Sequence, residues 1–152
     1  MVIALLIDIY FQLVSPKTDT FQENSRGGIR MPIKLGSCHC RAVLFQITLP
    51  NGMGELRRCN CSICRKKGAI MASVPIDQFV VLSGIENLTL YQWHTKIAKH
   101  YFCKTCGIYT HHLRRSAPNE YAFNVACIED MDEIDEAEIV QLNGANDSAF
   151  LK

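Results

Sequence analysis

The sequence predicts a small, mainly β domain with few short helices, and three observations lead to this prediction. Short runs in which apolar and polar residues alternate are bounded by turn-forming residues, as in half-buried strands. No long segment has the apolar periodicity of an amphipathic helix. All of the eight cysteines except Cys127 stand in short, closely spaced motifs, which favours a fold braced by metal.

The predicted strands follow one another at short intervals. CRAVLFQITLP predicts a strand that ends at Pro50, after which NGMG supplies a turn and a cysteine-rich loop follows. KHYFCKTCGIYTHHL predicts a hairpin that carries a CxxC motif at its turn. Further segments have the same β-prone character and are predicted as strands: GAIMASVP, FVVLSG, LTLYQW and EYAFNVACI.

Residues 1–30 differ in character from the rest of the chain. Residues 1–14 are strongly apolar, but they lack a basic leader and a small-residue cleavage site, and Asp8 interrupts them. They are also shorter than the roughly 20 apolar residues that a membrane-spanning helix needs. A polar stretch follows, and MPIKLGSCHC then resembles a domain start. We predict an appended or disordered extension over 1–30, a single metal-binding domain over 31–152, and a cytoplasmic location without a membrane partner.

Length and charge limit the organisation and the partners further. With 152 residues, of which 48% are hydrophobic, the chain can bury one ordinary core. The formal net charge of +1 provides no general attraction to nucleic acid. From Glu129 the tail is crowded with acidic residues, and we interpret it as a solvated surface segment. A local basic rim flanks the central cysteines and is either an anion site or simply solvated: Arg57, Arg58, Arg65, Lys66 and Lys67.

The clustered cysteines form a CxC, a CxCxxC and a CxxC motif. These motifs are Cys38 with Cys40, then Cys59, Cys61 and Cys64, then Cys103 with Cys106. Such spacings let neighbouring sulfurs converge on one ion at about 2.3 Å, whereas a disulfide between the cysteines of a CxC is sterically awkward. The spacing therefore predicts metal binding.

Two complete four-cysteine zinc sites would need one cysteine more than the three motifs supply. The two pairs can clamp one structural zinc between distant parts of the chain, and the triplet can hold a second zinc with an open position. Candidates for that fourth position are Cys127, His39, His94, His100, His111 and His112. Cys127 lies in an apolar run that favours packing, and adjacent histidines in a strand face opposite sides, so at most one of His111 and His112 lines the site.

Four segments, GSCHC, RRCNCSICRKKGAIM, HYFCKTCG and FNVACIED, together resemble the glutathione-dependent formaldehyde-activating enzyme and centromere protein V family over about residues 32–146. The resemblance implies a two-zinc β-tent fold related to methionine sulfoxide reductase B. It implies a structural zinc on Cys38, Cys40, Cys103 and Cys106, and a catalytic zinc on Cys59, Cys61 and Cys64. This chain departs from the family at Arg41, where glycine is common, and at LNGAND near its end, and these departures bear on substrate preference.

The implied activity is that of a zinc-dependent carbon–sulfur lyase, which joins glutathione to formaldehyde as an S-hydroxymethyl adduct in a detoxification route. Three thiolates blunt the Lewis acidity of zinc, and the basic rim is a candidate to offset their charge and to bind carboxylates. The residues identify no general base. Two alternatives stay open: a non-catalytic zinc module that binds protein or nucleic acid, which the near-neutral charge disfavours, and a fold in which both zinc sites are structural.

Overall fold

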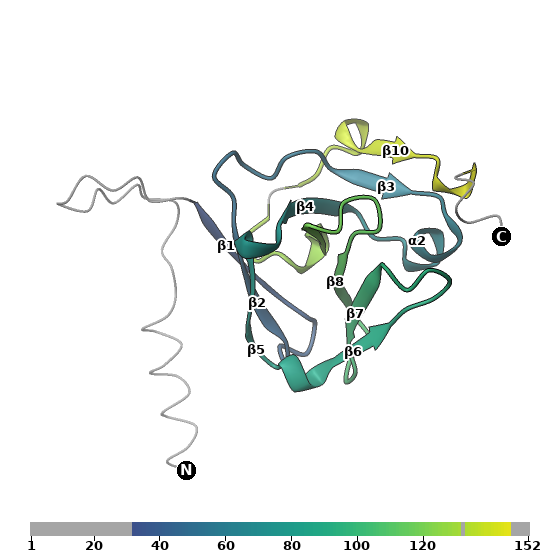
Figure 1. Cartoon of the computed structure of the whole chain (residues 1–152). Helices are drawn as coiled ribbons and strands as arrows, with labels where there is room; N and C mark the ends of the chain where they lie inside the picture. Colours follow the sequence, from purple (N-terminus) through teal and green to yellow (C-terminus); the bar gives the residue numbers. More distant parts are fainter. Residues whose placement is uncertain (1–31, 132, 147–152) are drawn as a thin grey trace, which may run out of the picture. The chain divides into compact units, whose positions relative to one another are not determined.

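A computed structural model describes residues 32–131 and 133–146, which fold into two β-sheets with few short helices (Figure 1). The prediction of a mainly β fold is therefore confirmed, while the more specific β-tent assignment stays a prediction. The extension predicted over 1–30 lies outside the described residues. No helix in the described part of the chain has both the length and the apolar character needed to cross a membrane.

The smaller sheet is antiparallel, with the strand order β1-β2-β5. Its strands are β1 (Ile33–Ser37), β2 (Leu44–Thr48) and β5 (Phe79–Ser83). The alternation in β2 buries Phe45 and Ile47 while Leu44 stays exposed, as the period of two predicts for a sheet with one covered face.

The larger sheet has the strand order β10-β3-β4-β9-β8-β7-β6. Its strands in chain order are β3 (Arg57–Cys59), β4 (Met71–Pro75), β6 (Leu88–Tyr91), β7 (Lys99–Cys103), β8 (Tyr109–Leu113), β9 (Glu120–Asn124) and β10 (Val140–Leu142). All neighbours pair antiparallel except β10 and β3, which are parallel. The hairpin predicted around the CxxC motif is formed by β7 and β8.

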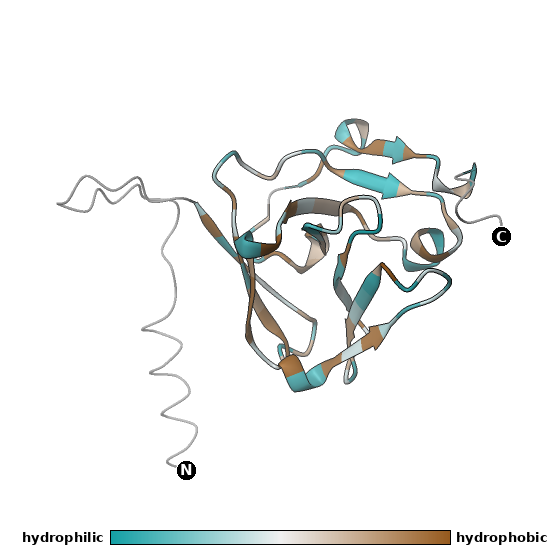
Figure 2. Ribbon diagram, viewed as in Figure 1, coloured by the Kyte–Doolittle hydropathy of each residue, from teal (hydrophilic) through white to brown (hydrophobic). Residues whose placement is uncertain are grey.

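The helices are short. Within the described residues the α-helix is α2 (Ser62–Lys67), which ends at Gly68 in a left-handed conformation with φ 64°. Single turns of 3-10 helix connect the other elements at Ile76–Gln78, Ile85–Asn87, Val125–Cys127, Glu136–Glu138 and Gly144–Asn146. The segment predicted as a cysteine-rich loop thus contains β3 and α2. In Figure 2, β3 is hydrophilic beside the more apolar β4, which explains why alternation did not reveal this strand.

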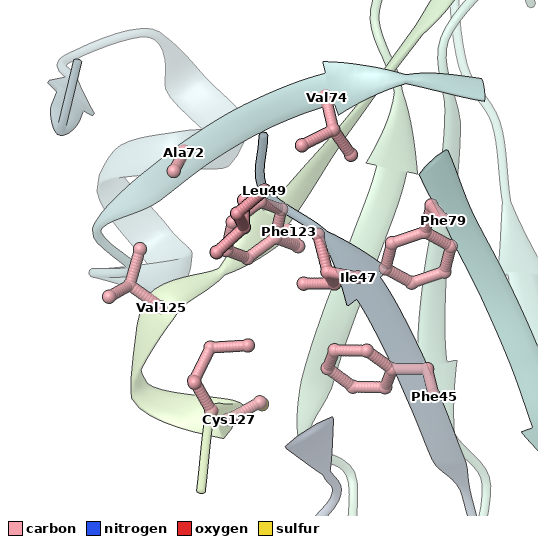
Figure 3. Close-up of a cluster of buried hydrophobic side chains, with 10 residues drawn as sticks. Phe45, Ile47, Leu49, Ala72, Val74, Phe79, Phe123, Val125 and Cys127 are labelled. Atoms are coloured by element: carbon pink, nitrogen blue, oxygen red, sulfur yellow. The ribbon is translucent and has the colours of Figure 1, made fainter. Parts of the chain in front are cut away.

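The main core lies between the two sheets (Figure 3). β2 and β5 contribute Phe45, Ile47 and Phe79, whose two aromatic rings stack at a centroid distance of 5.1 Å. The larger sheet contributes Val74 from β4 and Phe123 from β9. Burial of these side chains stabilises the sandwich by roughly 1.5–3 kcal/mol each relative to exposure.

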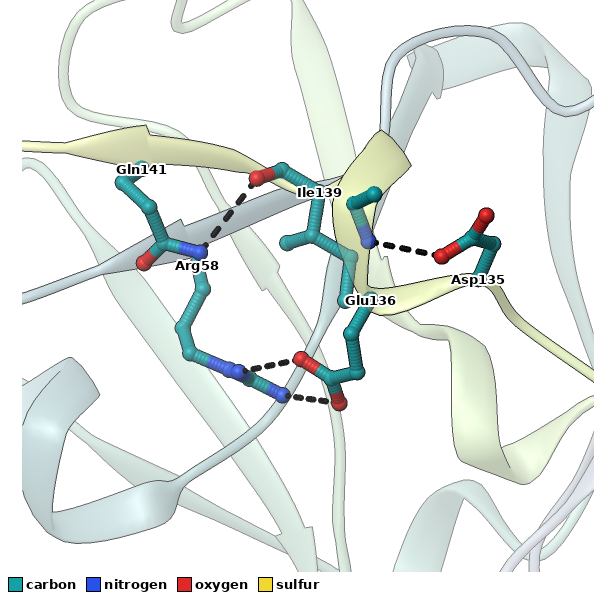
Figure 4. Close-up of polar contacts among 6 residues, drawn as sticks. Arg58, Asp135, Glu136, Ile139 and Gln141 are labelled. Atoms are coloured by element: carbon teal, nitrogen blue, oxygen red, sulfur yellow. Dashed lines mark hydrogen bonds and ion pairs between the residues drawn. The ribbon is translucent and has the colours of Figure 1, made fainter.

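The acidic tail is exposed along much of its length, as predicted, but it also completes the larger sheet. Arg58 donates two hydrogen bonds to the Glu136 carboxylate, at 2.8 and 3.1 Å, and the Asp135 carboxylate accepts from the Ala137 amide at 2.8 Å (Figure 4). Ile139 is buried at 5% exposure, and β10 then pairs with β3, with Leu142 opposite Cys59. The tail therefore returns to the central cysteine motif.

Candidate metal centres and pocket

The first cysteine group joins the two sheets. Cys38 and Cys40 follow β1 of the smaller sheet, while Cys103 ends β7 of the larger sheet and Cys106 lies in the turn to β8. Their four sulfurs all lie within 4.8 Å of one another. Cys40 Sγ is 3.6 Å from both Cys38 Sγ and Cys103 Sγ. The fold thus brings together the two cysteine pairs that were expected to form one group.

Backbone hydrogen bonds and turn conformations shape the two segments that carry these cysteines. The Val43 amide donates to Cys38 Sγ at 3.3 Å, and Gly107, with φ 72°, donates from its amide to the Cys103 carbonyl at 2.8 Å. Arg41 has φ 60°, which explains why glycine suits this turn, and its guanidinium pairs with Glu129 at 3.3 Å. Burial raises the pKa of Cys38 to about 12, so a cation nearby would favour its thiolate form.

The second group is the triplet. Cys59 ends β3, Cys61 directly precedes α2, and Cys64 lies within that helix. Their sulfurs all lie within 4.8 Å of one another. Hydrogen bonds, first from the Cys64 side chain and also from the amides of Cys64 and Ile63, lower the pKa of Cys61 to about 5. The start of α2 therefore favours negative charge on Cys61.

Gly144 from the tail packs against this triplet. A Cβ at this position would lie 2.6 Å from Cys59 Sγ and 3.1 Å from Cys61 Cβ. Asn60 Nδ2 donates to Asn143 Oδ1 at 2.9 Å, and Asn60 Oδ1 accepts from the Ala145 amide at 2.8 Å, which fixes the tail there. Sequence reasoning missed this role, although the departure at LNGAND was a signal.

The described residues provide no fourth protein ligand atom for the triplet. No other His, Cys, Asp or Glu atom of residues 32–131 and 133–146 completes the group of three. Cys127 packs in the main core instead, in agreement with its predicted role as a small hydrophobe. His39 is exposed beside the first group. His111 is buried at 3% exposure and stacks on Tyr101 at 4.6 Å.

A pocket of ≈ 370 Å³ opens over the triplet. All three cysteines line it, together with three of the histidine candidates, His94, His100 and His112. His112 lines the pocket while His111 points into aromatic packing, so the two neighbours face opposite sides as the strand period predicts. The remaining lining contains both apolar residues, such as Met71 and Leu142, and basic residues.

The basic residues that line the pocket differ from those of the predicted rim. Arg57 and Lys67 line the pocket, whereas Arg58 pairs with Glu136 outside it. Arg65 lines a smaller pocket beside Gly144, and Lys66 is exposed and outside both linings. Two basic residues of the lining that sequence reasoning missed, Arg114 and Arg115, directly follow β8. The motif HHLRR, in which one leucine separates the paired histidines from the two arginines, was the available signal.

A chain of buried and half-buried polar side chains lines the pocket. Lys67 Nζ lies 2.9 Å from His100 Nδ1, which lies 3.1 Å from Tyr109 Oη. Tyr109 Oη lies 2.5 Å from His112 Nδ1. Burial lowers the pKa of Lys67 to about 8 and that of His100 to about 4, and it holds the pKa of His112 well below its usual value.

The chemistry of the two donor sets fits a metal ion. Sulfur-only groups with such short separations suit a soft, tetrahedral cation, and burial of thiolates without a counter-charge is costly. Both groups can therefore hold metal ions. The first group offers a closed set of four ligands, whereas the triplet offers three and faces a pocket.

Known proteins are similar to this chain in sequence, and one solved structure is also similar in fold. The family model described as glutathione-dependent formaldehyde-activating enzyme matches residues 34–141. A protein of Halomonas elongata that bears the name of this enzyme family is 39% identical over 81 residues, covering 47% of this chain and 50% of that protein. The match thus spans about half the length of this curated relative. A Rhodobacter sphaeroides protein of known crystal structure is 51% identical in sequence to this chain. The two structures match with a TM-score of 0.66, over 70% of this chain and 98% of that one.

Proposed function

Because this chain belongs to the glutathione-dependent formaldehyde-activating enzyme family, we propose that it joins a thiol, glutathione foremost, to formaldehyde to give an S-hydroxymethyl adduct. The observation that carries this proposal is the cysteine triplet at the wall of a basic pocket, without a fourth protein ligand among the described residues. An open coordination position beside a substrate-sized pocket is the mark of a catalytic rather than a structural metal site.

Zinc is the proposed metal at both centres, one ion for each. The group formed by Cys38, Cys40, Cys103 and Cys106 would hold the structural zinc, and Cys59, Cys61 and Cys64 would hold the catalytic one. When bound at an open position, zinc lowers the pKa of an incoming thiol so that it is deprotonated at neutral pH. This division is supported by the number of sulfur ligands, which is four in the first group and three in the triplet.

The arginines that line the pocket are suited to the carboxylates of glutathione. Arg57 is largely buried, with its side chain 16% exposed, and burial together with the nearby charge of Arg114 lowers its pKa. A carboxylate bound between these two guanidinium groups would relieve their repulsion. The arginines thereby orient the thiol end of the substrate toward the triplet.

The proposed reaction is an addition that needs no oxidant or reductant. The sulfur of the thiol forms a bond to the carbonyl carbon, and the π pair of the carbonyl moves to its oxygen. One proton leaves the thiol and one proton is taken up by the oxygen, so the product is a neutral hydroxymethyl thioether. The same pocket can run the step in reverse, which is the carbon–sulfur lyase direction.

Exchange spectroscopy by NMR tests this function, with glutathione and formaldehyde at equilibrium and catalytic amounts of protein. The wild-type protein is expected to accelerate exchange between free glutathione and the adduct, and Cys61→Ser is expected to abolish the acceleration. Cys127→Ala removes a thiol outside both groups and serves as the matched control. If the wild-type rate equals the spontaneous rate, the proposed function is wrong.

A further inference from the structure

Lys67 is a half-buried cation in the pocket that pairs with no carboxylate of residues 32–131 and 133–146. Its Nζ lies 2.9 Å from His100 Nδ1 and 3.4 Å from the centroid of the Tyr109 ring. An ammonium group carries three N–H donors, and His100 accepts one of them. Cation–π contact with Tyr109 holds the charge in place without accepting a conventional hydrogen bond.

The polar chain behind Lys67 orients this ammonium group. With Lys67 charged, His100 Nδ1 is the acceptor in their contact, because an ammonium group has no lone pair. The single lone pair of this nitrogen is then taken by Lys67, and Tyr109 Oη forms its shorter contact, at 2.5 Å, with His112 Nδ1. His100 thus accepts a hydrogen bond from Lys67 and holds the ammonium group in place.

The position of Lys67 relative to the triplet follows from α2. Cys64 and Lys67 are three residues apart in this helix and therefore share a face, and both line the pocket with Cys59 and Cys61. The neighbouring basic residues Arg65 and Lys66 lie on other faces of the helix and outside this lining. Lys67 therefore lines the same pocket as the three cysteine sulfurs, and its remaining N–H donors can reach a substrate bound there.

We propose that Lys67 is a catalytic residue that donates a hydrogen bond to the aldehyde oxygen, and that His100 and Tyr109 are positioning residues that aim it. This inference rests on the proposed function. As the thiol sulfur bonds to the carbon, the carbonyl π pair moves to the oxygen, and the Lys67 ammonium stabilises the negative charge there. The oxygen then takes up one proton, matching the proton that left the thiol, so atoms and charge balance.

The burial of Lys67 supports this role. Desolvation lowers its pKa to about 8, which keeps the ammonium charged at neutral pH yet poorly solvated, and an oxyanion restores the lost solvation. A different role, in which Lys67 only offsets the charge of the cysteines, makes a different prediction. It requires that removal of the ammonium weakens zinc binding, while turnover per bound zinc stays the same.

The test compares Lys67→Met with Lys66→Met, a matched change on the exposed face of the same helix. We expect Lys67→Met to lower kcat on the order of 100-fold. The variant should still bind both zinc ions. Its KM for glutathione and its calorimetric affinity for glutathione should stay within about twofold of wild type, because the lost contact forms in the transition state. Lys67→Arg should recover part of kcat, Tyr109→Phe should lower kcat with unchanged KM, and Lys66→Met should match wild type.

Unchanged kcat in Lys67→Met, or a loss of kcat that matches a loss of zinc, would overturn the inference. If the wild-type protein is active while Lys67→Met is equally active, the inference fails and the proposed function stands. If the wild-type protein does not accelerate adduct exchange, both fail together. Circular dichroism of Lys67→Met and Lys67→Arg identifies any loss of folding, and a folded Lys67→Arg variant without any recovery of kcat also counts against the role.

Discussion

A Cβ placed on Gly144 would lie 2.6 Å from the sulfur of Cys59, so the tail packs at Gly144 directly against the proposed catalytic centre. Such a separation is shorter than an unstrained contact between carbon and sulfur, and Asn60 and Asn143 fix the tail where this contact occurs. The tail therefore forms part of the site, although its described residues, 129–131 and 133–146, contribute no ligand to the triplet. Substitutions at this point should act on the metal centre itself.

Gly144→Ala is expected to displace Cys59 and to weaken zinc binding at the triplet, because neither the tail nor the sulfur can move without loss of contacts. Zinc content should fall toward one ion per chain, and exchange activity should fall with it, while the fold persists. Ala145→Ser, on the exposed neighbour, is the control. Elemental analysis of the purified variants measures the effect, and a fully loaded, active Gly144→Ala variant would contradict the close packing.

The two cysteine groups should differ in their effect on stability. Cys40→Ser breaks the group that joins the two sheets, and structural zinc of this kind contributes on the order of 10 kcal/mol to folding. We therefore expect Cys40→Ser to be unfolded at 25 °C by circular dichroism, whereas Cys61→Ser stays folded and inactive. The reverse pattern would show that the roles of the two groups are exchanged.

Arg57 and Arg58 provide a matched pair for testing substrate binding. Arg57 lines the pocket with 16% of its side chain exposed, whereas Arg58 is 37% exposed and pairs with Glu136 outside it. Arg57→Gln should raise the KM for glutathione about tenfold, the usual scale for one charge-assisted contact. Arg58→Gln should leave KM unchanged and stability almost unchanged, because exposed ion pairs contribute little. Equal effects on KM would remove Arg57 from the proposed carboxylate site.

Stability should depend on pH through His111. Burial among Phe79, Tyr101 and Tyr121 lowers the pKa of His111 to about 3, from an ordinary value of 6.5. Between these values the unfolded chain binds more protons than the folded one. The contribution of His111 to stability is thus present above pH 6.5, and it is lost as the pH falls from there toward 3, by up to about 1.4 kcal/mol per pH unit.

His111→Phe keeps an aromatic ring in this packing and removes the titrating group. The free energy of unfolding of the variant should therefore fall less steeply than that of wild type between pH 7 and pH 5 in urea denaturation. Because both proteins keep all cysteines, protonation of the metal ligands affects them alike and cancels in the difference. Parallel slopes for the two proteins would mean that His111 does not carry the dependence.

Local sequence patterns predicted the parts of the fold that local physics determines. The alternation around Phe45 and the aromatic strand that ends at Cys103 were recognised because a covered sheet face imposes a period of two. The grouping of cysteines followed from the short reach of a CxC or CxxC motif. His111 and His112 could be separated in advance because neighbouring strand residues face opposite sides.

The remaining features depend on contacts between distant segments. β3 and β10 contain three residues each and pair in parallel, so neither has a pattern of its own, and their register is set by tertiary packing. The contact between Gly144 and Cys59 follows from that pairing and was not predictable from spacing. Arg114 joins the pocket because β8 ends there, whereas Arg58, although next to a cysteine in sequence, is directed to Glu136 by the alternation along β3.

The central claim is that the four-cysteine group is closed while the triplet keeps a position open for the substrate thiol. Cadmium-113 NMR of the cadmium-substituted protein tests this directly, because each site gives its own resonance and the shift reports the number of sulfur ligands. We predict two resonances, of which one moves toward the four-sulfur range when glutathione is added and is absent in Cys61→Ser. If both resonances already lie in the four-sulfur range and neither moves with glutathione, the triplet is a closed structural site and the account is wrong.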